Sequence, residues 1–331
     1  MHVSFFVRAP FGAGSGSYAY DHGLVAGLRG LGHTVAIIEA HPGISLADPP
    51  DGTPRLIDGP ALPTLLERDD KALGQPLFGL IHHSTMPAPD ADEAARHALR
   101  AAAERHFGRF VRLVATGEPT VEWLVNECRV SRDRVALVVP GTDDAPRCPG
   151  SDGSGCHILS IGALVPRKGH DVLMRALVRL FDLDWHLTIV GSAERDPVHA
   201  RALAALADTL GITHRVRFAG RVTDAALDAL WQESDLFALA TRFETYGMPV
   251  AAALKRGLPV AVTAGGAAGA LVAPEAGVVC PLDDESQLSK ALRRLIFGRT
   301  LRRDMGEVAW QIGQTLPTWR MQAELLVRAL A

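Results

Sequence analysis

Residues 241–249 carry the residue types best suited to chemistry. They stand between a short apolar run and a run of small residues, a pattern that predicts a strand, a turn and a helix. The carboxylate of Glu244 can accept hydrogen bonds from hydroxyl groups, and Tyr246, Gly247 and Met248 stand where a helix start offers free backbone N–H groups. The segment therefore suits a sugar and a phosphate held side by side. A helix N-cap is the alternative role for Glu244.

Two adjacent cations, Arg167 and Lys168, stand in a second loop between a predicted strand and a predicted helix, within residues 162–171. Positive side chains at the N-terminus of a helix oppose the helix dipole unless an anion neutralises them. The loop therefore predicts a bound anion, and a diphosphate suits the two charges. A pair of charges that only faces solvent is the alternative.

Two glycine-rich segments also follow predicted strands. Gly14 and Gly16 belong to residues 12–17, where backbone N–H groups suit a phosphate or a sugar hydroxyl. The third glycine of a dinucleotide motif is replaced there by a serine, so a plain turn or a substrate loop fits better than a nicotinamide site. Gly265 and Gly266 follow a later strand and predict either a turn or a second phosphate nest.

A histidine pair, His82 and His83, ends the predicted strand 77–82. Ligands of α/β sheets bind at the carboxyl ends of the strands, so we expect at least one imidazole to point out of that edge. A histidine that only forms a hydrogen bond at a strand end is the alternative.

Short apolar runs alternate with longer amphipathic segments along the chain, which predicts parallel strands joined by crossover helices. The predicted strands are 3–7, 34–39, 77–82, 112–115, 135–139, 157–161, 186–190, 216–218, 236–239, 259–263 and 277–279. Helices are predicted over 17–31, 92–107, 119–128, 171–180 and 200–210. The pattern indicates two doubly wound α/β sheets with a binding cleft between them. We interpret residues 45–75 as a surface excursion.

The boundary between the two predicted domains falls near residue 150. Residues 140–155 include three Pro, four Gly and three Asp with almost no large apolar side chain, a composition typical of a linker. We therefore expect one domain over 1–149 and a second over 150–331. Residues 317–330 have apolar side chains at helical spacing, and we expect this last helix to return to the first domain.

The composition predicts a folded, soluble and cytoplasmic protein. The chain has 331 residues, of which 47% are hydrophobic and 21% charged. A formal net charge of -3 leaves no basic field for nucleic acid. The four cysteines form no C-x-x-C pair, so they predict free thiols and no metal site. The N-terminus lacks the pattern of a signal peptide, and Lys255 and Arg256 interrupt the longest apolar stretch.

A run of arginines in the first half bears on membrane contact. It consists of Arg96, Arg100, Arg105, Arg109 and Arg112, with one glutamate among them. At helical spacing these side chains project to two sides, so a solvated charged surface is the main interpretation. Peripheral contact with the anionic inner face of a membrane is the alternative.

Taken in order, these segments resemble the retaining glycosyltransferases of family four, which have the GT-B fold of two facing Rossmann-like domains. The resemblance spans nearly the whole chain and is sharpest in the second half, which resembles the donor domain. The segments that carry it are 162–171, 234–237, 243–247, 256–260, 265–266 and 280–283. In the first half the glycine loop, His82 with His83, and residues 115–117 and 139–141 stand in the family's order.

The resemblance implies an enzyme that moves a sugar from a nucleoside-diphosphate donor, with UDP or GDP, to a hydroxyl acceptor with retention of configuration. It implies no metal and no cofactor besides the donor substrate, and an acceptor that is a small molecule, a glycan or a lipid-linked hydroxyl. Lys168 would hold the diphosphate, Glu244 would accept hydrogen bonds from the donor sugar, and Gly247 and Met248 would offer backbone N–H groups. The remaining candidates are His82 and His83 for catalysis, and Gly14, Gly16, Arg167, Tyr246, Gly265 and Gly266 for donor binding.

Two positions depart from the family's pattern. The arginine of the strand loop falls on Ala163, which leaves Arg167 as its substitute, and the second glutamate, eight residues after the first, falls on Ala252. In the family that glutamate reaches the nucleotide ribose. A non-catalytic relative that binds a sugar nucleotide or a protein partner is therefore the alternative, and a nicotinamide oxidoreductase is a more distant one.

Overall fold

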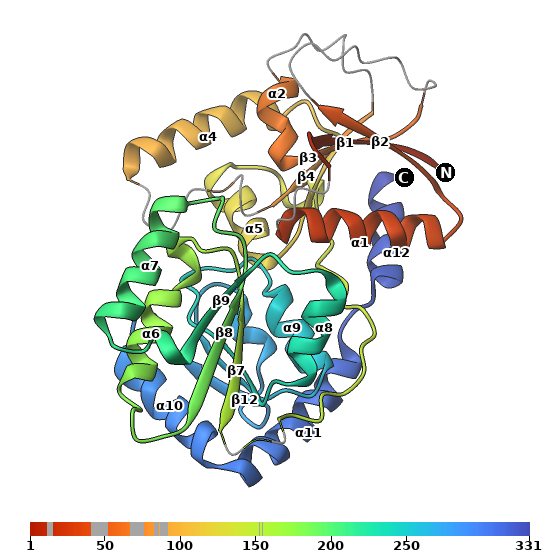
Figure 1. Ribbon diagram of the computed structural model, residues 1–331. Helices are drawn as coiled ribbons and strands as arrows, with labels where there is room; N and C mark the ends of the chain where they lie inside the picture. The colour runs from red at the N-terminus through yellow and green to blue at the C-terminus, as the bar shows by residue number, and fades with distance from the viewer. Residues whose placement is uncertain are drawn as a thin grey trace. The chain divides into compact units, whose positions relative to one another are not determined.

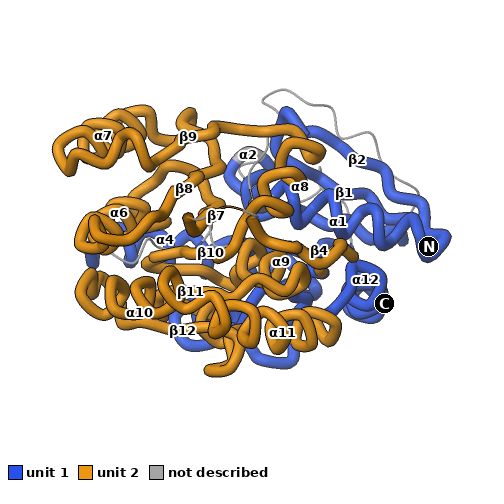
Figure 2. The backbone as a smooth tube through the Cα atoms, turned by 60° about the horizontal axis from the view of Figure 1, so that its bottom comes forward, with its two compact units in different colours: residues 1–141, 317–331 blue, residues 142–316 orange. Residues whose placement is uncertain are grey.

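The computed structural model describes residues 1–11, 16–40, 52–66, 76–82, 86, 92–151, 153 and 155–331. Two compact units divide the chain: unit 1 consists of Met1–Gly141 and Pro317–Ala331, and unit 2 consists of Thr142–Leu316 (Figure 2). Among the described residues, no helix combines the length and the apolar content that crossing a bilayer requires.

Unit 1 is built on a parallel sheet of six strands in the order β2-β1-β3-β4-β5-β6. The strands are β1 (His2–Arg8), β2 (Thr34–Ala40), β3 (Arg55–Asp58), β4 (Leu77–Ile81), β5 (Arg112–Ala115) and β6 (Val135–Leu137). Its helices are α1 (Gly16–Gly30), α2 (Leu62–Leu66), α4 (Glu93–Phe107), α5 (Glu118–Glu122) and α12 (Trp319–Leu330), with a π-helical turn, η3, over Trp123–Glu127. The strand order reverses between β1 and β3, so this unit has a topological switch point there.

The interpretation of residues 45–75 as a surface excursion is wrong for its described part. Residues Arg55–Asp58 form β3, which pairs with both β1 and β4 and has four buried residues. The strand is only four residues long and has a charged residue at each end, so apolar patterning does not reveal it. A central strand of a parallel sheet is nevertheless covered on both faces, which buries Arg55 and Asp58.

The last helix, α12, packs against α1, and both belong to unit 1. Two glycines of α1 make this close approach possible. A Cβ atom on Gly23 would lie 2.2 Å from Cε2 of Trp319, and one on Gly27 would lie 2.6 Å from the Trp319 carbonyl oxygen. The indole also meets Tyr20 edge to face, with ring centroids 5.5 Å apart. The last helix therefore packs on unit 1, as the amphipathic pattern of residues 317–330 led us to expect.

Unit 2 is a second parallel sheet, in the order β12-β11-β10-β7-β8-β9. Its strands are β7 (Cys156–Ile161), β8 (Trp185–Val190), β9 (Val216–Gly220), β10 (Leu236–Leu239), β11 (Val260–Thr263) and β12 (Gly277–Cys280). Its helices are α6 (His170–Val178), α7 (Pro197–Thr209), α8 (Asp224–Gln232), α9 (Met248–Lys255), α10 (Glu285–Phe297) and α11 (Arg299–Thr315). Read from β9, the order is the Rossmann order, with its switch point between β7 and β10.

Alternating residues of the unit 2 strands supply its two apolar layers. Ile158 and Leu236 face a cluster with α6, α7 and α10, while their neighbours Leu159 and Phe237 face a cluster with α8, α9 and α11. Figure 1 shows α6 and α10 on one side of β7 and β8, and α8 and α9 on the other. Because successive side chains of a strand point to opposite faces, a strand covered on both sides has no polar alternation.

Residues 142–149 belong to unit 2, so the expected boundary near residue 150 lies eight residues too late. Polar contacts hold this segment where its composition offers little apolar surface. The Cys148 amide donates to the Arg256 carbonyl at 2.9 Å, Lys255 pairs with Asp144 at 2.9 Å, and Arg147 pairs with Glu307 at 2.7 Å.

Candidate functional site

The loops after β7 and β10 meet at the switch point of unit 2. These strands are hydrogen-bonded neighbours, and their helices leave in opposite directions from the sheet. Ligands of doubly wound sheets bind in the crevice at such a point. The loop after β7 carries Arg167 and Lys168, and the loop after β10 carries Glu244, so the fold brings together the two segments that the sequence singled out.

Gly169 allows the first loop to approach the second. Its φ of 63° is left-handed, and a Cβ atom there would lie 1.8 Å from the carbonyl oxygen of Ala240. Gly162 acts in the same region, because a Cβ atom on it would lie 2.8 Å from Cδ of Lys168. The two glycines let the Lys168 side chain pass inward, and only 8% of this residue is exposed. The alternative that Lys168 is a solvated surface charge is therefore wrong.

The carboxylate of Glu244 is the point where the site's polar side chains converge. Its Oε1 lies 2.5 Å from Nζ of Lys168 and 3.0 Å from a guanidinium nitrogen of Arg167. The hydroxyl of Thr241 donates to the same oxygen at 3.2 Å. The sequence did not predict this role for Thr241, whose position three residues before the glutamate carries no motif.

Two cations on one carboxylate leave this cluster with an excess positive charge. Burial is the main cause that lowers the pKa of Lys168, and Arg167 lowers it further, whereas Glu244 opposes both. An anion bound beside Lys168 and Arg167 would balance the excess charge and stabilise the ammonium form. The arrangement is therefore suited to a phosphate group next to a hydrogen-bond acceptor.

Backbone contacts fix Glu244 from the opposite side, through Gly265 and Gly266. The Glu244 amide donates to the Gly265 carbonyl at 3.0 Å, and the Ala267 amide donates to the Glu244 carbonyl at 2.8 Å. A Cβ atom on Gly266, whose φ is 67°, would lie 2.1 Å from the Glu244 carbonyl oxygen. The glycine pair thus forms a tight turn that positions Glu244, one of the two roles that the sequence left open.

The helix α9 begins at Met248, directly after this turn, with Gly247 as its N-cap at a φ of 106°. The alternative role of Glu244 as the N-cap is therefore wrong. No side chain caps this helix. Pro249 has no N–H and the Val250 amide donates to the Gly247 carbonyl at 2.9 Å, so Gly247 and Met248 are left to offer backbone N–H groups to an anion. Tyr246 is buried, and burial raises its pKa to about 12.

Arg242 joins three segments around the site. Its guanidinium pairs with both carboxylate oxygens of Asp171, at 3.2 and 3.0 Å, and its Nε pairs with Asp283 at 2.8 Å. Asp171 lies in the first turn of α6, and Asp283 follows β12. Arg242 therefore holds the loop after β10 against the loops after β7 and β12, a positioning role that the sequence analysis did not assign.

The two departures from the family's pattern lie at different places in unit 2. Ala163 stands in the loop after β7, while Ala252 lies on α9 and packs against the apolar cluster of α8, α9 and α11. Arg167 contacts Glu244 directly, which keeps it as the candidate for the charge missing at Ala163.

Of the four candidate residues in unit 1, Gly16 and His82 lie among the described residues. Gly14 and His83 lie outside the described residues, and Gly16 is the first residue of α1. His82 is only 3% exposed, with its Nε2 3.3 Å from Asp21 and 3.0 Å from Asp58. Burial lowers the pKa of His82, but the two carboxylates outweigh it and raise the pKa to about 10, and burial raises the pKa of Asp21 to about 6.

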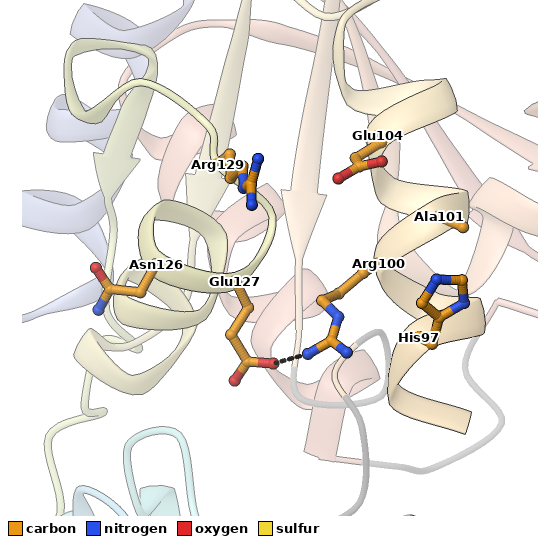
Figure 3. A pocket seen from close by; sticks show the side chains of 7 residues that line it. All are labelled: His97, Arg100, Ala101, Glu104, Asn126, Glu127 and Arg129. Carbon is orange, nitrogen blue, oxygen red and sulfur yellow. Dashed lines mark ion pairs between the residues drawn. The ribbon is translucent and has the colours of Figure 1, made fainter. Parts of the chain in front are cut away.

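One member of the arginine run, Arg100 of α4, lines a pocket of mixed charge. This pocket of about 410 Å³ lies between α4 and η3 (Figure 3). Arg100 reaches across it to Glu127 at 3.8 Å and also pairs with Glu93. Arg112 donates to the Ala329 carbonyl at 3.1 Å. Acidic partners and backbone carbonyls therefore take up part of the positive charge that the sequence displays.

Comparison with known proteins points to the same half of the chain as the cluster of Lys168, Arg167 and Glu244. Residues 146–311, about half of the chain, match the family model described as "Glycosyl transferases group 1". Mannosylfructose-phosphate synthase of Agrobacterium fabrum is 28% identical over 168 residues, which cover 46% of this chain and 37% of the relative. D-inositol 3-phosphate glycosyltransferase of Salinispora tropica is 32% identical over 212 residues, which cover 56% of this chain and 43% of the relative.

The chain thus spans about half the length of the curated relatives that it matches, from 37% to 61%. A solved structure matches it throughout: the Anabaena protein HepE in complex with UDP-glucose superposes with a TM-score of 0.78 at 16% identity, covering 100% of this chain and 99% of that one. At this identity the likeness shows the fold alone. Together, the family match and the two doubly wound sheets show that the chain belongs to the group 1 glycosyl transferases and has the GT-B fold.

Proposed function

We propose that the chain transfers a sugar from a nucleoside-diphosphate donor to a hydroxyl acceptor with retention of configuration. The observation that supports this most is the convergence of Lys168 and Arg167 on Glu244 at the switch point of unit 2. The relatives are named as a synthase and as glycosyltransferases, and HepE binds UDP-glucose, which supports a nucleotide sugar as the donor.

Lys168 and Arg167 stabilise the leaving group in this proposal. When the bond between the sugar and the diphosphate breaks, the diphosphate takes the electron pair and gains negative charge. Two cations that are already in place stabilise that charge without reorganisation, and the uncapped N-terminus of α9 adds backbone donors. These groups supply the charge stabilisation for a metal-independent transfer.

Glu244 positions the donor sugar. Its carboxylate accepts hydrogen bonds from sugar hydroxyls while Lys168 and Arg167 hold the adjacent diphosphate. The acceptor hydroxyl attacks from the face that the diphosphate leaves, and its proton passes to an oxygen of the departing diphosphate. The configuration at the anomeric carbon is thereby retained, with no covalent intermediate on the protein.

A binding panel distinguishes the donor bases and separates a sugar-nucleotide enzyme from an oxidoreductase. The full chain is heated with UDP, GDP, UDP-glucose, GDP-mannose or NAD, and the unfolding temperature is recorded. We expect UDP or GDP, with the matching sugar nucleotide, to raise the unfolding temperature, since a ligand that binds only the folded state stabilises it. A rise with NAD alone would favour an oxidoreductase and overturn the proposal.

A further inference from the structure

Three ionisable groups of unit 1 converge at a buried point outside the proposed transfer site. Asp21 comes from α1, Asp58 ends β3, and His82 follows β4 directly. Both aspartates are 0% exposed and the histidine 3%. One atom from each residue lies within 4.8 Å of the other two. Elements far apart in the sequence thus deliver two carboxylates and one imidazole to the same place.

Hydrogen bonds from the described part of the chain do not satisfy the two carboxylates of this cluster. Both carboxylates approach the same nitrogen, Nε2 of His82, at 3.3 and 3.0 Å, and that nitrogen carries at most one hydrogen. Apart from this imidazole, no donor among the described residues reaches any of the four carboxylate oxygens. Buried carboxylates without donors are unfavourable and call for a counter-charge. A protonated imidazole balances one carboxylate, whereas a divalent cation balances both.

The geometry resembles a ligand set before the ion is added. Zn²⁺ binds imidazole nitrogen and carboxylate oxygen at about 2.0–2.2 Å, so neighbouring donors of a tetrahedral ion stand about 3.4 Å apart. The separations from Nε2 to the two carboxylates, 3.3 and 3.0 Å, are close to that value. A mixed nitrogen and oxygen set suits first-row transition metals, while Mg²⁺ and Ca²⁺ prefer oxygen alone.

The imidazole is also held in orientation. The ring of Tyr20 meets the His82 ring edge to face, with centroids 5.3 Å apart. The Tyr20 hydroxyl is itself anchored, because it donates to the Val138 carbonyl at 2.8 Å. Packing of this kind keeps the Nε2 atom directed at the two carboxylates, as neighbouring groups that hold the ring do for metal-bound histidines.

We propose that Asp21, Asp58 and His82 form a binding site for a divalent first-row transition-metal ion, with Zn²⁺ as the best fit. The ion would tie α1 to the carboxyl ends of β3 and β4. Its role is structural, because all three side chains are almost fully buried. The remaining coordination position suits the second oxygen of either carboxylate. The site does not depend on the proposed transfer reaction, whose residues lie in unit 2.

The test begins with metal content and thermal stability. The full chain is treated with a chelator, dialysed, and titrated with Zn²⁺ or Mg²⁺, and bound metal and unfolding temperature are measured. We expect one Zn²⁺ per chain and a rise in the unfolding temperature that Mg²⁺ does not reproduce. Asp58→Asn should weaken Zn²⁺ binding by more than about 100-fold, beyond the usual effect of changing a residue that only supports a metal ligand.

Surface groups provide the matched controls. Asp133→Asn and His186→Gln change an exposed carboxylate and an exposed imidazole, and both variants should bind Zn²⁺ like the parent. The chain has 13 histidines, so surface binding must be distinguished from the buried site. Zn²⁺ binding that survives in Asp58→Asn and is lost in His186→Gln would overturn the proposal.

A spectroscopic measurement on the parent keeps the test decisive if Asp58→Asn does not fold. Co²⁺ replaces Zn²⁺ and absorbs visible light strongly when it is four-coordinate. We expect such absorption at one equivalent, without the intense near-ultraviolet band of a cobalt–thiolate bond, because no cysteine belongs to the cluster. A parent chain that shows only the spectrum of hydrated Co²⁺, and that Zn²⁺ does not stabilise, would mean that the cluster shares a proton instead.

Discussion

The ammonium group of Lys168 lies 2.5 Å from Oε1 of Glu244, and the two residues come from loops after different strands, β7 and β10. The pair stands at the switch point of the unit 2 sheet, and Arg167 contacts the same carboxylate oxygen. Since two cations share one carboxylate, the three side chains together carry one excess positive charge. An anionic ligand completes the charge balance, and this expectation leads to the first two predictions.

Lys168→Ala and Arg167→Ala should each weaken the binding of UDP or GDP, whichever the parent binds. A hydrogen bond to a charged group contributes about 1.5–3 kcal/mol, which corresponds to a loss of affinity of roughly 10- to 150-fold. Isothermal titration calorimetry measures the change. Lys290→Ala, which removes an exposed lysine of α10, is the matched control and should bind like the parent. Equal affinity in all four proteins would exclude these cations from the binding site.

Glu244→Gln should separate nucleotide binding from sugar transfer. The variant keeps the size of the side chain but removes the negative charge that now holds Lys168 and Arg167. Binding of free UDP or GDP should therefore be unchanged or tighter, while transfer falls by about 10- to 150-fold, the range for one charge-assisted hydrogen bond. Glu275→Gln, at an exposed position, is the control. A parallel loss of both properties, in proportion to unfolded protein, would point to a purely structural role for Glu244.

Gly169→Ala should destabilise the protein far more than Gly211→Ala. Both glycines have left-handed φ angles, 63° and 68°, so the backbone strain is matched at about 1–2 kcal/mol. At Gly211 a Cβ atom meets nothing within 4 Å, whereas at Gly169 it would lie 1.8 Å from the Ala240 carbonyl oxygen. Urea unfolding measures the difference. Equal losses would show that the loops after β7 and β10 do not need this close approach.

The unfolding free energy should depend on pH through His170, which is buried in unit 2 beside the Gly162 carbonyl. Burial lowers its pKa to about 4, from an ordinary value of 6.5. The unfolded chain therefore binds a proton at a higher pH than the folded chain does. The stability from this residue is complete above pH 6.5 and is lost as the pH falls from 6.5 to about 4.

The size of that loss is on the order of 3 kcal/mol, because the pKa of His170 lies at about 4 in the folded chain and at 6.5 in the unfolded one. His170→Gln keeps a hydrogen-bond donor without the titration, so its unfolding free energy should fall less over the same pH range. Urea titrations at a series of pH values compare the two proteins. Identical pH profiles would mean that His170 accepts its proton freely in the folded chain.

Much of the fold follows from the sequence because parallel strands buried on both faces are continuous apolar runs. Residues 236–239 were predicted as a strand with the bounds that β10 has. The strand β3 escapes this reasoning, because Arg55–Asp58 is short and ends in buried charges. The groups that surround a buried charge at a strand end come from distant parts of the chain, as Asp21 and His82 do for Asp58. A local sequence pattern therefore does not identify such a strand.

The sequence predicts which residues belong to the candidate site, but not which of them touch. The residue types and loops of Lys168, Arg167 and Glu244 follow from local pattern, since each stands between a strand and a helix. Their convergence on one carboxylate oxygen depends on the adjacency of β7 and β10, which no local pattern specifies. For the same reason, the roles of Thr241 and Arg242 became visible only with the folded loops.

Sugar-nucleotide turnover by the full chain tests the central claim most directly. The parent, Lys168→Ala and Lys290→Ala are incubated with UDP- and GDP-sugars and a broad set of hydroxyl acceptors, and both nucleoside diphosphate and the anomeric configuration of the product are measured. The account predicts that the parent and Lys290→Ala release the diphosphate and retain the donor configuration, and that Lys168→Ala loses most of this activity. A parent chain that binds UDP or GDP without turnover would contradict it and indicate a non-catalytic binding protein, and an inverted product would contradict the proposed mechanism.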